Sequence, residues 1–181
     1  MKVYFAGSLF THKDLAGNAM LADEIGRVSG GKFECLLPQN IEHRGSSPKE
    51  IRDADISALL SCDLALFNYD GCELDSGTVV EFMFAKFADI PSVLLRTDFR
   101  TGGDSGENPW NLMTSYYPRT ETLVLDAAKI YASCDRDYRK AATEIAGKVV
   151  EKLEFLSHTA PAMPDRLRPA VFEWLSKLPN A

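Results

Sequence analysis

The chain has 181 residues, a length that fits one domain with a full hydrophobic core. Hydrophobic residues make up 45% of the sequence and charged residues 25%, as in ordinary globular proteins. A net charge of −6, without any cluster of Lys or Arg, argues against a binding surface for nucleic acid or for an acidic membrane. We therefore expect a small-molecule ligand.

Cysteine and histidine spacing predicts neither a zinc site nor a disulfide framework. The four cysteines include no Cys-x-x-Cys pair, and the three histidines are equally dispersed. We expect no metal and no cofactor. The chain passes from Met1 directly into an apolar run too short for a signal peptide, and no run could span a membrane. These features predict a cytoplasmic protein.

The sequence pattern in the first third of the chain predicts two strands and two helices. Residues 2–8 form a short apolar strand that ends in a Gly-Ser turn, without the Gly-x-Gly-x-x-Gly fingerprint of dinucleotide binding. Apolar residues at helical spacing follow over 14–28, and residues 33–37 form the second strand. After a polar loop over 39–47, Ser47-Pro48 and an acid at the third position begin the next helix.

That second helix places Asp55 on or beside its apolar stripe. Burying a carboxylate without a partner is costly, so Asp55 either finds one or lies in water at the edge of the stripe. Residues 62–69 form the third strand, and we expect Asp63 to cap the end of the helix before it.

The remaining chain continues the alternation of strand and helix. We expect strands at 92–96 and 122–125, a mobile loop or lid at 97–109 and a long amphipathic helix at 137–156. This order predicts a doubly wound α/β fold, flavodoxin-like or Rossmann-like. Its five-stranded parallel sheet has the order 2-1-3-4-5 and helices on both faces. We assign 1–156 to this domain and 157–181 to a helical tail. The tail is either part of the same domain or an oligomer contact, and an exposed-looking Phe172 and Trp174 favour a subunit contact.

The stretch from Asp70 to Phe82 is the first candidate site. It places Asp75 and Glu81 around a Ser-Gly-Thr turn that follows a strand, and ligands of open α/β sheets bind at strand carboxyl ends. We expect Ser76 to cap a helix that starts at Gly77. The helix is apolar nearly all round, which predicts burial on more than one face. By itself the stretch fits a plain helix cap followed by a solvated glutamate better than it fits a functional site.

Tyr4, Ser8, Asp55, Asp75 and Glu81 are all expected at one edge of the sheet. Several acids without metal ligands favour carboxylate chemistry, in which an ionised carboxylate attacks a carbon and a protonated one releases the leaving group. Retaining glycosidases divide the work of two carboxylates in this way.

Four short motifs in this order resemble the nucleoside 2-deoxyribosyltransferase family. They are Val3-Tyr4-Phe5-Ala6-Gly7-Ser8, Asp55, the run Asp75-Ser76-Gly77-Thr78-Val79-Val80-Glu81, and Asn111-Leu112-Met113. The resemblance spans about residues 2–126 and leaves the tail uncovered. It implies a transferase of nucleotide salvage that acts on 2′-deoxyribonucleosides and free nucleobases.

The resemblance also implies a role for each matched residue. Glu81 would attack C1′ to form a deoxyribosyl ester, and Asp55 would protonate the departing base. Asp75 would hold a sugar hydroxyl, and Tyr4 would orient Glu81. Asn111 and Met113 would reach the site of a neighbouring subunit, so the family pattern implies a homo-oligomer. The remaining substrate-binding candidates are Gly7, Ser8, Phe10, Gln39 as a base ligand, Ser76 and Gly77.

Two other functions stay open. One is hydrolysis of a 2′-deoxynucleoside 5′-monophosphate, which needs a phosphate pocket. The loop Ser8-Leu9-Phe10-Thr11 lacks the Arg-Gly-Gly that would help to build such a pocket, so transfer is favoured. The other is a sensor that binds a nucleoside or nucleotide without turnover. Base preference does not follow from the sequence.

Overall fold

A computed structural model describes residues 1–41, 46–100 and 108–178 of the chain. Its centre is a five-stranded, all-parallel sheet in the order β2-β1-β3-β4-β5, which confirms the predicted fold class and strand order. The strands are β1 (Lys2–Ala6), β2 (Glu34–Leu36), β3 (Leu64–Asn68), β4 (Ser92–Arg96) and β5 (Thr120–Val124).

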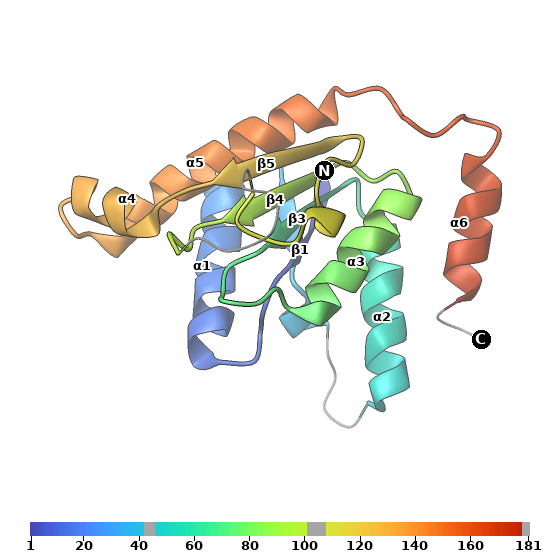
Figure 1. Ribbon diagram of the computed structural model, residues 1–181, viewed down its shortest axis with the longest axis horizontal. Helices are drawn as coiled ribbons and strands as arrows, with labels where there is room; N and C mark the ends of the chain where they lie inside the picture. Colours follow the sequence, from blue (N-terminus) through green and yellow to red (C-terminus); the bar gives the residue numbers. More distant parts are fainter. Residues whose placement is uncertain (42–45, 101–107, 179–181) are drawn as a thin grey trace.

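Helices cover both faces of the sheet (Figure 1). One face carries α1 (His12–Val28) and α5 (Tyr138–Ser157), and the other carries α2 (Pro48–Leu60) and α3 (Ser76–Phe87). The smaller elements are α4 (Ala127–Ser133), α6 (Arg168–Lys177) and the short 3-10 helices η1 (Pro38–Asn40) and η2 (Leu112–Thr114).

Alternation along the strands divides the core into two layers. In β1, Val3 and Phe5 pack against α1 and α5, whereas Tyr4 and Ala6 pack on the side of α2 and α3. Successive side chains of a strand point to opposite faces, which accounts for this division. The same alternation decides on which side of the sheet each functional side chain lies.

Local capping corrects several predicted boundaries. Helix α1 begins at His12 because Thr11 and Asp14 form a capping box, and Ser47 caps α2 as predicted. Asp63 does not cap a helix; its Oδ2 accepts a hydrogen bond of 2.8 Å from the backbone N of Lys2. Strand β5 begins at Thr120, before the predicted start, and α4 was not predicted.

Helix α3 differs from its prediction in two ways. Its N-cap is Asp75 rather than Ser76, because Asp75 Oδ2 accepts hydrogen bonds from Thr78 N at 2.8 Å and Thr78 Oγ1 at 2.9 Å. Burial is also one-sided: Phe82 is in the core, but Val80 is 52% and Phe87 55% exposed in the single chain. The helix therefore presents an apolar surface to its surroundings.

The tail returns to the body of the protein and packs against it. In Figure 1, α6 lies beside α2, and Leu175 is buried in the core layer under α2 and α3. Phe172 is partly buried against the same layer, so of the aromatic pair expected to be exposed only Trp174, at 59%, is exposed. None of the described helices is long and apolar enough to cross a lipid bilayer.

Candidate active site

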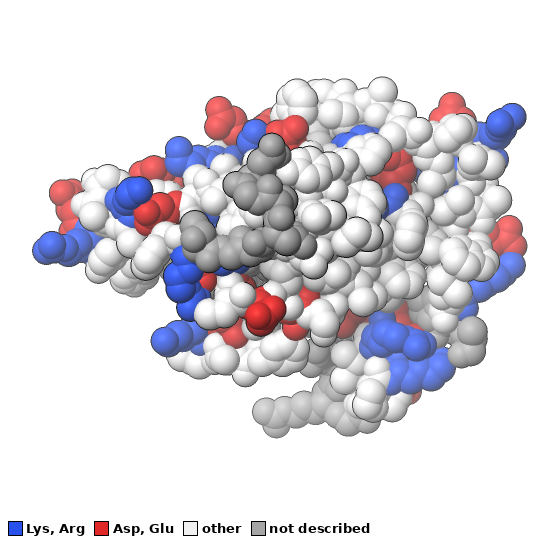
Figure 2. Space-filling model, viewed as in Figure 1, with Lys and Arg blue, Asp and Glu red and all other residues white. Residues whose placement is uncertain are grey.

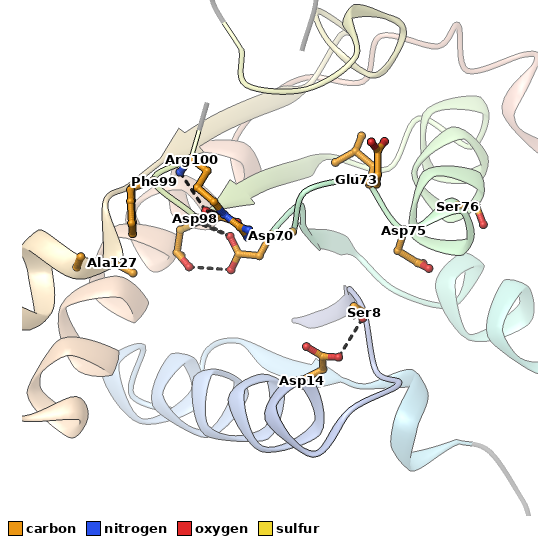
Figure 3. A pocket seen from close by; sticks show the side chains of 14 residues that line it. Ser8, Asp14, Asp70, Glu73, Asp75, Ser76, Asp98, Phe99, Arg100 and Ala127 are labelled. Carbon is orange, nitrogen blue, oxygen red and sulfur yellow. Dashed lines mark hydrogen bonds and ion pairs between the residues drawn. The ribbon is translucent and has the colours of Figure 1, made fainter. Parts of the chain in front are cut away.

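A cleft opens at the carboxyl ends of the strands, where β1 and β3 lie side by side. In a sheet with this strand order, β1 and β3 lead to helices on opposite faces, and ligands bind in the crevice between them. The cleft has a volume of about 820 Å³. Ser8 follows β1, Asp70 follows β3, and Asp75 precedes α3, and Figure 3 shows all three around the opening.

A tyrosine–glutamate pair lies next to this cleft. The hydroxyl of Tyr4, in β1, donates a hydrogen bond of 2.6 Å to Oε1 of Glu81, in the second turn of α3. Tyr4 is fully buried, so its ring is held in place by the core and its hydroxyl has a fixed position. Within the described residues, Oε2 of Glu81 has no hydrogen-bond partner, which leaves this oxygen available to a substrate.

Asp55 and Asp75 complete a group of three carboxylates. Asp55 of α2 and Glu81 of α3 line one groove of about 500 Å³ between the two helices, together with Ser76 and Gly77. Ser76 also lines the larger cleft, so the groove and the cleft adjoin at the start of α3. Asp55 is half-buried.

The surroundings shift the protonation of Glu81. The pKa of its carboxyl is raised to about 7: burial is the largest cause, the nearby charges of Asp55 and Asp75 add to the rise, and the hydrogen bond from Tyr4 opposes it. Burial and the adjacent Glu81 also raise the pKa of the Tyr4 hydroxyl far above its usual value, so this group remains a donor. Perturbed carboxyl groups beside a cleft are typical of active sites.

Three of the predicted substrate-binding residues line these cavities, and a fourth shapes them. Ser8 and Ser76 line the cleft, and Gly77 lines the groove. Gly7 is buried where the chain leaves β1, and a Cβ there would lie only 3.0 Å from Cβ of Asn68. Glycine at this position allows the loops after β1 and β3 to approach each other closely.

The other four predicted residues lie elsewhere. Phe10 is 76% exposed, and Gln39 donates from Nε2 to the backbone O of Leu15 at 3.1 Å. Asn111 accepts a hydrogen bond from Met113 N and caps η2, where both residues are exposed. None of the four is among the described residues that line the cleft or the groove.

Sequence reasoning assigned no role to four acids that line the cleft: Asp14, Asp70, Glu73 and Asp98. Asp70 accepts hydrogen bonds from Thr97 N, Thr97 Oγ1 and Asp98 N at 2.5 to 2.8 Å, and so joins the loops after β3 and β4. Asp98 in turn pairs with Arg100 (Figure 3). The position of Asp70 directly after a predicted strand could have indicated its place at this edge.

Parts of two predicted loops lie outside the described residues. They are residues 42–45 of the polar loop over 39–47 and residues 101–107, which are most of the predicted mobile loop or lid. Within the described residues, no group of three or more His, Cys, Asp or Glu could hold a metal ion.

The fold and the site define a doubly wound α/β protein with a carboxylate-rich site at the switch point of its sheet. The model of one family, nucleoside 2-deoxyribosyltransferase, matches residues 3–113, which is more than half of the chain. The protein belongs to this family, whose members act on nucleosides and nucleobases. A search of the curated proteins found no match.

Two of the solved structures that match this chain share its fold. A conserved protein from Enterococcus faecalis V583 is 25% identical with a TM-score of 0.55, and the match covers 85% of this chain and 97% of that one. A 2-desoxiribosyltransferase from Leishmania mexicana is 22% identical with a TM-score of 0.53, covering 73% and 94%. The CMP N-glycosidase BcmB from Clostridium botulinum is 16% identical with a TM-score of 0.49, covering 76% and 100%.

Proposed function

We propose that this protein transfers a 2-deoxyribosyl group from one nucleobase to another through a covalent intermediate on Glu81. The observation that carries this proposal is the hydrogen bond from buried Tyr4 to Glu81, which lines the groove beside the cleft together with Asp55. Membership of the family agrees with it. Such an exchange reuses preformed bases and therefore belongs to nucleoside salvage.

In the first half-reaction, a carboxylate oxygen of Glu81 attacks C1′ of a 2′-deoxyribonucleoside. The bond from C1′ to the base nitrogen breaks, its electron pair leaves with the base, and Asp55 supplies the proton that the base needs. Tyr4 holds Glu81 Oε1 and fixes the direction of the carboxylate. The result is a deoxyribosyl ester of Glu81 and a free base.

In the second half-reaction, a nitrogen of another base attacks C1′ and displaces the Glu81 carboxylate. The proton lost from that nitrogen returns to Asp55, so the enzyme regains its starting state. Each displacement inverts C1′, and two inversions give net retention. Asp75, at the start of α3, is the carboxylate that would hold a sugar hydroxyl.

Charge in the cleft favours a nucleoside over a nucleotide substrate. Among its described lining residues there are five carboxylates, whereas the single cation, Arg100, is paired with Asp98. A phosphate group would be repelled by these carboxylates. The competing function, hydrolysis of a 2′-deoxynucleoside 5′-monophosphate, requires such a group.

Exposed apolar residues on α3 and η2 support a homo-oligomer. Asn111 and Met113 lie away from the cleft of their own chain, so contact with a sugar requires a second copy. The surface over α3 and η2 carries few charged residues (Figure 2). The exposed apolar residues there are Val80, Phe87, Leu112, Met113 and Tyr116.

The test is base exchange. Protein incubated with deoxyinosine and adenine should form deoxyadenosine, and Glu81→Ala should abolish the product while Glu151→Ala, on an exposed position of α5, retains it. Without acceptor, mass spectrometry should find a deoxyribosyl adduct on Glu81. Absence of product with every purine and pyrimidine acceptor would exclude the transferase.

The alternatives predict other outcomes of the same assay. Stoichiometric release of free deoxyribose while acceptor is in excess would indicate a hydrolase. A sensor would show no turnover, and Glu81→Ala would leave its ligand affinity nearly unchanged.

A further inference from the structure

A second cavity lies on the opposite face of the sheet from Glu81. It measures about 340 Å³, within the range of about 300 to 1,000 Å³ that is usual for small-molecule sites. Its walls come from α1, α4 and α5 and from the ends of β3 and β4. Figure 1 shows α4 and the first turns of α5 extending past the carboxyl edge of the sheet. Leu95, which lines the cavity, belongs to the core layer under α1 and α5, whereas Tyr4 belongs to the other layer.

A glycine inside α1 keeps this cavity open. Gly17 lines it, and a Cβ built on Gly17 would meet no heavy atom within 4 Å. Glycine in a helix interior is less favourable than alanine, and packing does not require it here. A larger side chain at this position would project into the cavity rather than into the protein.

Two amides give the cavity a matched donor and acceptor. Asn18 Nδ2 donates to Ser8 O at 2.9 Å, and Asn68 Oδ1 accepts from Asp70 N at 3.1 Å, so both side-chain orientations are fixed. Asn18 Oδ1 and Asn68 Nδ2 remain, and neither has a hydrogen-bond partner within the described residues. The edges of nucleobases present complementary donors and acceptors.

Aromatic and charged residues further limit the ligand. Tyr131 of α4 and Tyr138 of α5 line the cavity, and aromatic rings pack well against planar groups. The carboxylates of Asp14 and Asp70 at its rim are already hydrogen-bonded, and Lys13 is the one cation among its described lining residues. This balance disfavours an anion and suits a planar, uncharged heterocycle.

We propose that this cavity is a second binding site, for a free nucleobase, which adjoins the catalytic cleft through Ser8, Asp14 and Asp70. The planar, uncharged class of ligand follows from the walls of the cavity. The choice of a nucleobase within that class rests on the proposed function. The site lies across the sheet from the Tyr4–Glu81 pair, so a base bound there is not positioned for attack on C1′.

Equilibrium dialysis with labelled adenine, hypoxanthine, cytosine and thymine, one at a time, tests this site. The variants are Gly17→Leu, which adds a bulky side chain to the lining of the cavity, and Gly147→Leu, a matched control in α5. Gly147 is also a helical glycine with no heavy atom within 4 Å of a built Cβ, and it does not line the cavity. For at least one base, Gly17→Leu should raise the dissociation constant of one of the binding sites at least tenfold. Gly147→Leu should leave that dissociation constant unchanged. Equal binding by both variants for all four bases would overturn the proposal.

Tyr131→Ala is the second variant, in case circular dichroism shows that Gly17→Leu is unfolded. It removes one aromatic wall from the short, partly exposed α4 and should weaken the same class of sites. Unchanged binding would then count against the site. If the protein binds a base in the cavity but does not exchange bases, only the proposed function is overturned. If it exchanges bases but shows no binding that depends on the cavity, only the second site is overturned.

Discussion

Tyr4 and Glu81 are 77 positions apart in the chain, yet the tyrosine hydroxyl lies 2.6 Å from the glutamate carboxylate. The tyrosine is fully buried in β1, and the glutamate is in the second turn of α3. A hydrogen bond from a buried donor stabilises the ionised form of the carboxyl group. Tyr4 therefore holds one oxygen of the proposed nucleophile and favours its ionised form, against the larger effect of burial.

Replacement of Tyr4 should shift the pH dependence of transfer. Glu81 must be ionised to attack, so kcat/KM should fall as pH drops below about 7, the value to which its surroundings raise its pKa. Tyr4→Phe loses this hydrogen bond, and a hydrogen bond to a charged acceptor contributes about 1.5 to 3 kcal/mol. The acidic limb of the pH profile should therefore move up by about one to two pH units. Pre-steady-state and steady-state rates across pH measure the shift. Tyr69→Phe, at another buried tyrosine, is the control, and an unmoved limb in Tyr4→Phe would contradict the role.

Glu81 should also make stability depend on pH. Its pKa is raised on folding, from 4.5 to about 7, so the folded state binds the proton more tightly. The stabilisation is complete below about pH 4.5 and is lost as pH rises through about 7. Relative to Glu81→Gln, the wild-type free energy of unfolding should therefore fall by up to about 3 kcal/mol across this window. Urea unfolding at several pH values measures it, with Glu151→Gln as control, and a flat difference would contradict the raised pKa.

Asp75 has two separable functions, a helix cap and a carboxylate. Asp75→Asn keeps a good N-cap, so stability should change by less than about 0.5 kcal/mol, whereas loss of the charge should lower kcat/KM about 10- to 100-fold. Asp75→Ala loses both functions and about 1 kcal/mol of stability as well. Asp137→Ala, which removes the cap of α5, should cost stability without the loss of transfer. Full transfer activity in Asp75→Asn would reduce Asp75 to a cap.

Shared sites between subunits should allow two inactive variants to restore activity. Glu81→Gln lacks the nucleophile, and Asn111→Ala lacks the group offered to the neighbouring site. If both are dissociated and reassociated together as random dimers, about a quarter of the sites contain both intact residues. Transfer should recover to about that fraction in the mixture and in neither variant alone. No recovery would place Asn111 outside the neighbour's site.

Asp89 should hold the tail to the body of the protein. Its Oδ2 accepts hydrogen bonds from Ala162 N at 2.9 Å and Met163 N at 3.1 Å, and it pairs with Arg119 at 3.0 Å. Asp89 has a φ of 55°, which asparagine also tolerates, so Asp89→Asn tests the charge without backbone strain. Breaking this buried pair should cost about 3 kcal/mol and expose the tail to limited proteolysis. Asp135→Asn, at an exposed ion pair, should change stability by less than about 1 kcal/mol.

Local sequence alone determined much of the architecture. Alternating apolar runs and helical spacing fixed the five strands and their order, because parallel strands joined by helices have few ways to connect. The sequence pattern did not locate a helix start to the exact residue where short polar side chains at nearby positions could each cap the same backbone N–H groups. Asp75 rather than Ser76 caps α3 for this reason, and the same limit explains the early start of α1 at His12.

The four motifs in order determined the candidate catalytic residues, but only the tertiary structure brought Tyr4, Asp55 and Glu81 together. Their proximity depends on which face of the sheet each residue occupies, and that face is set by strand register and by helix packing across long stretches of chain. The carboxylates of Asp14, in the first turn of α1, and of Asp70 and Asp98, in the loops after β3 and β4, are also brought to the cleft by tertiary packing. The cavity beside Gly17 is likewise a product of tertiary packing, because an empty space between helices leaves no periodic trace in a sequence.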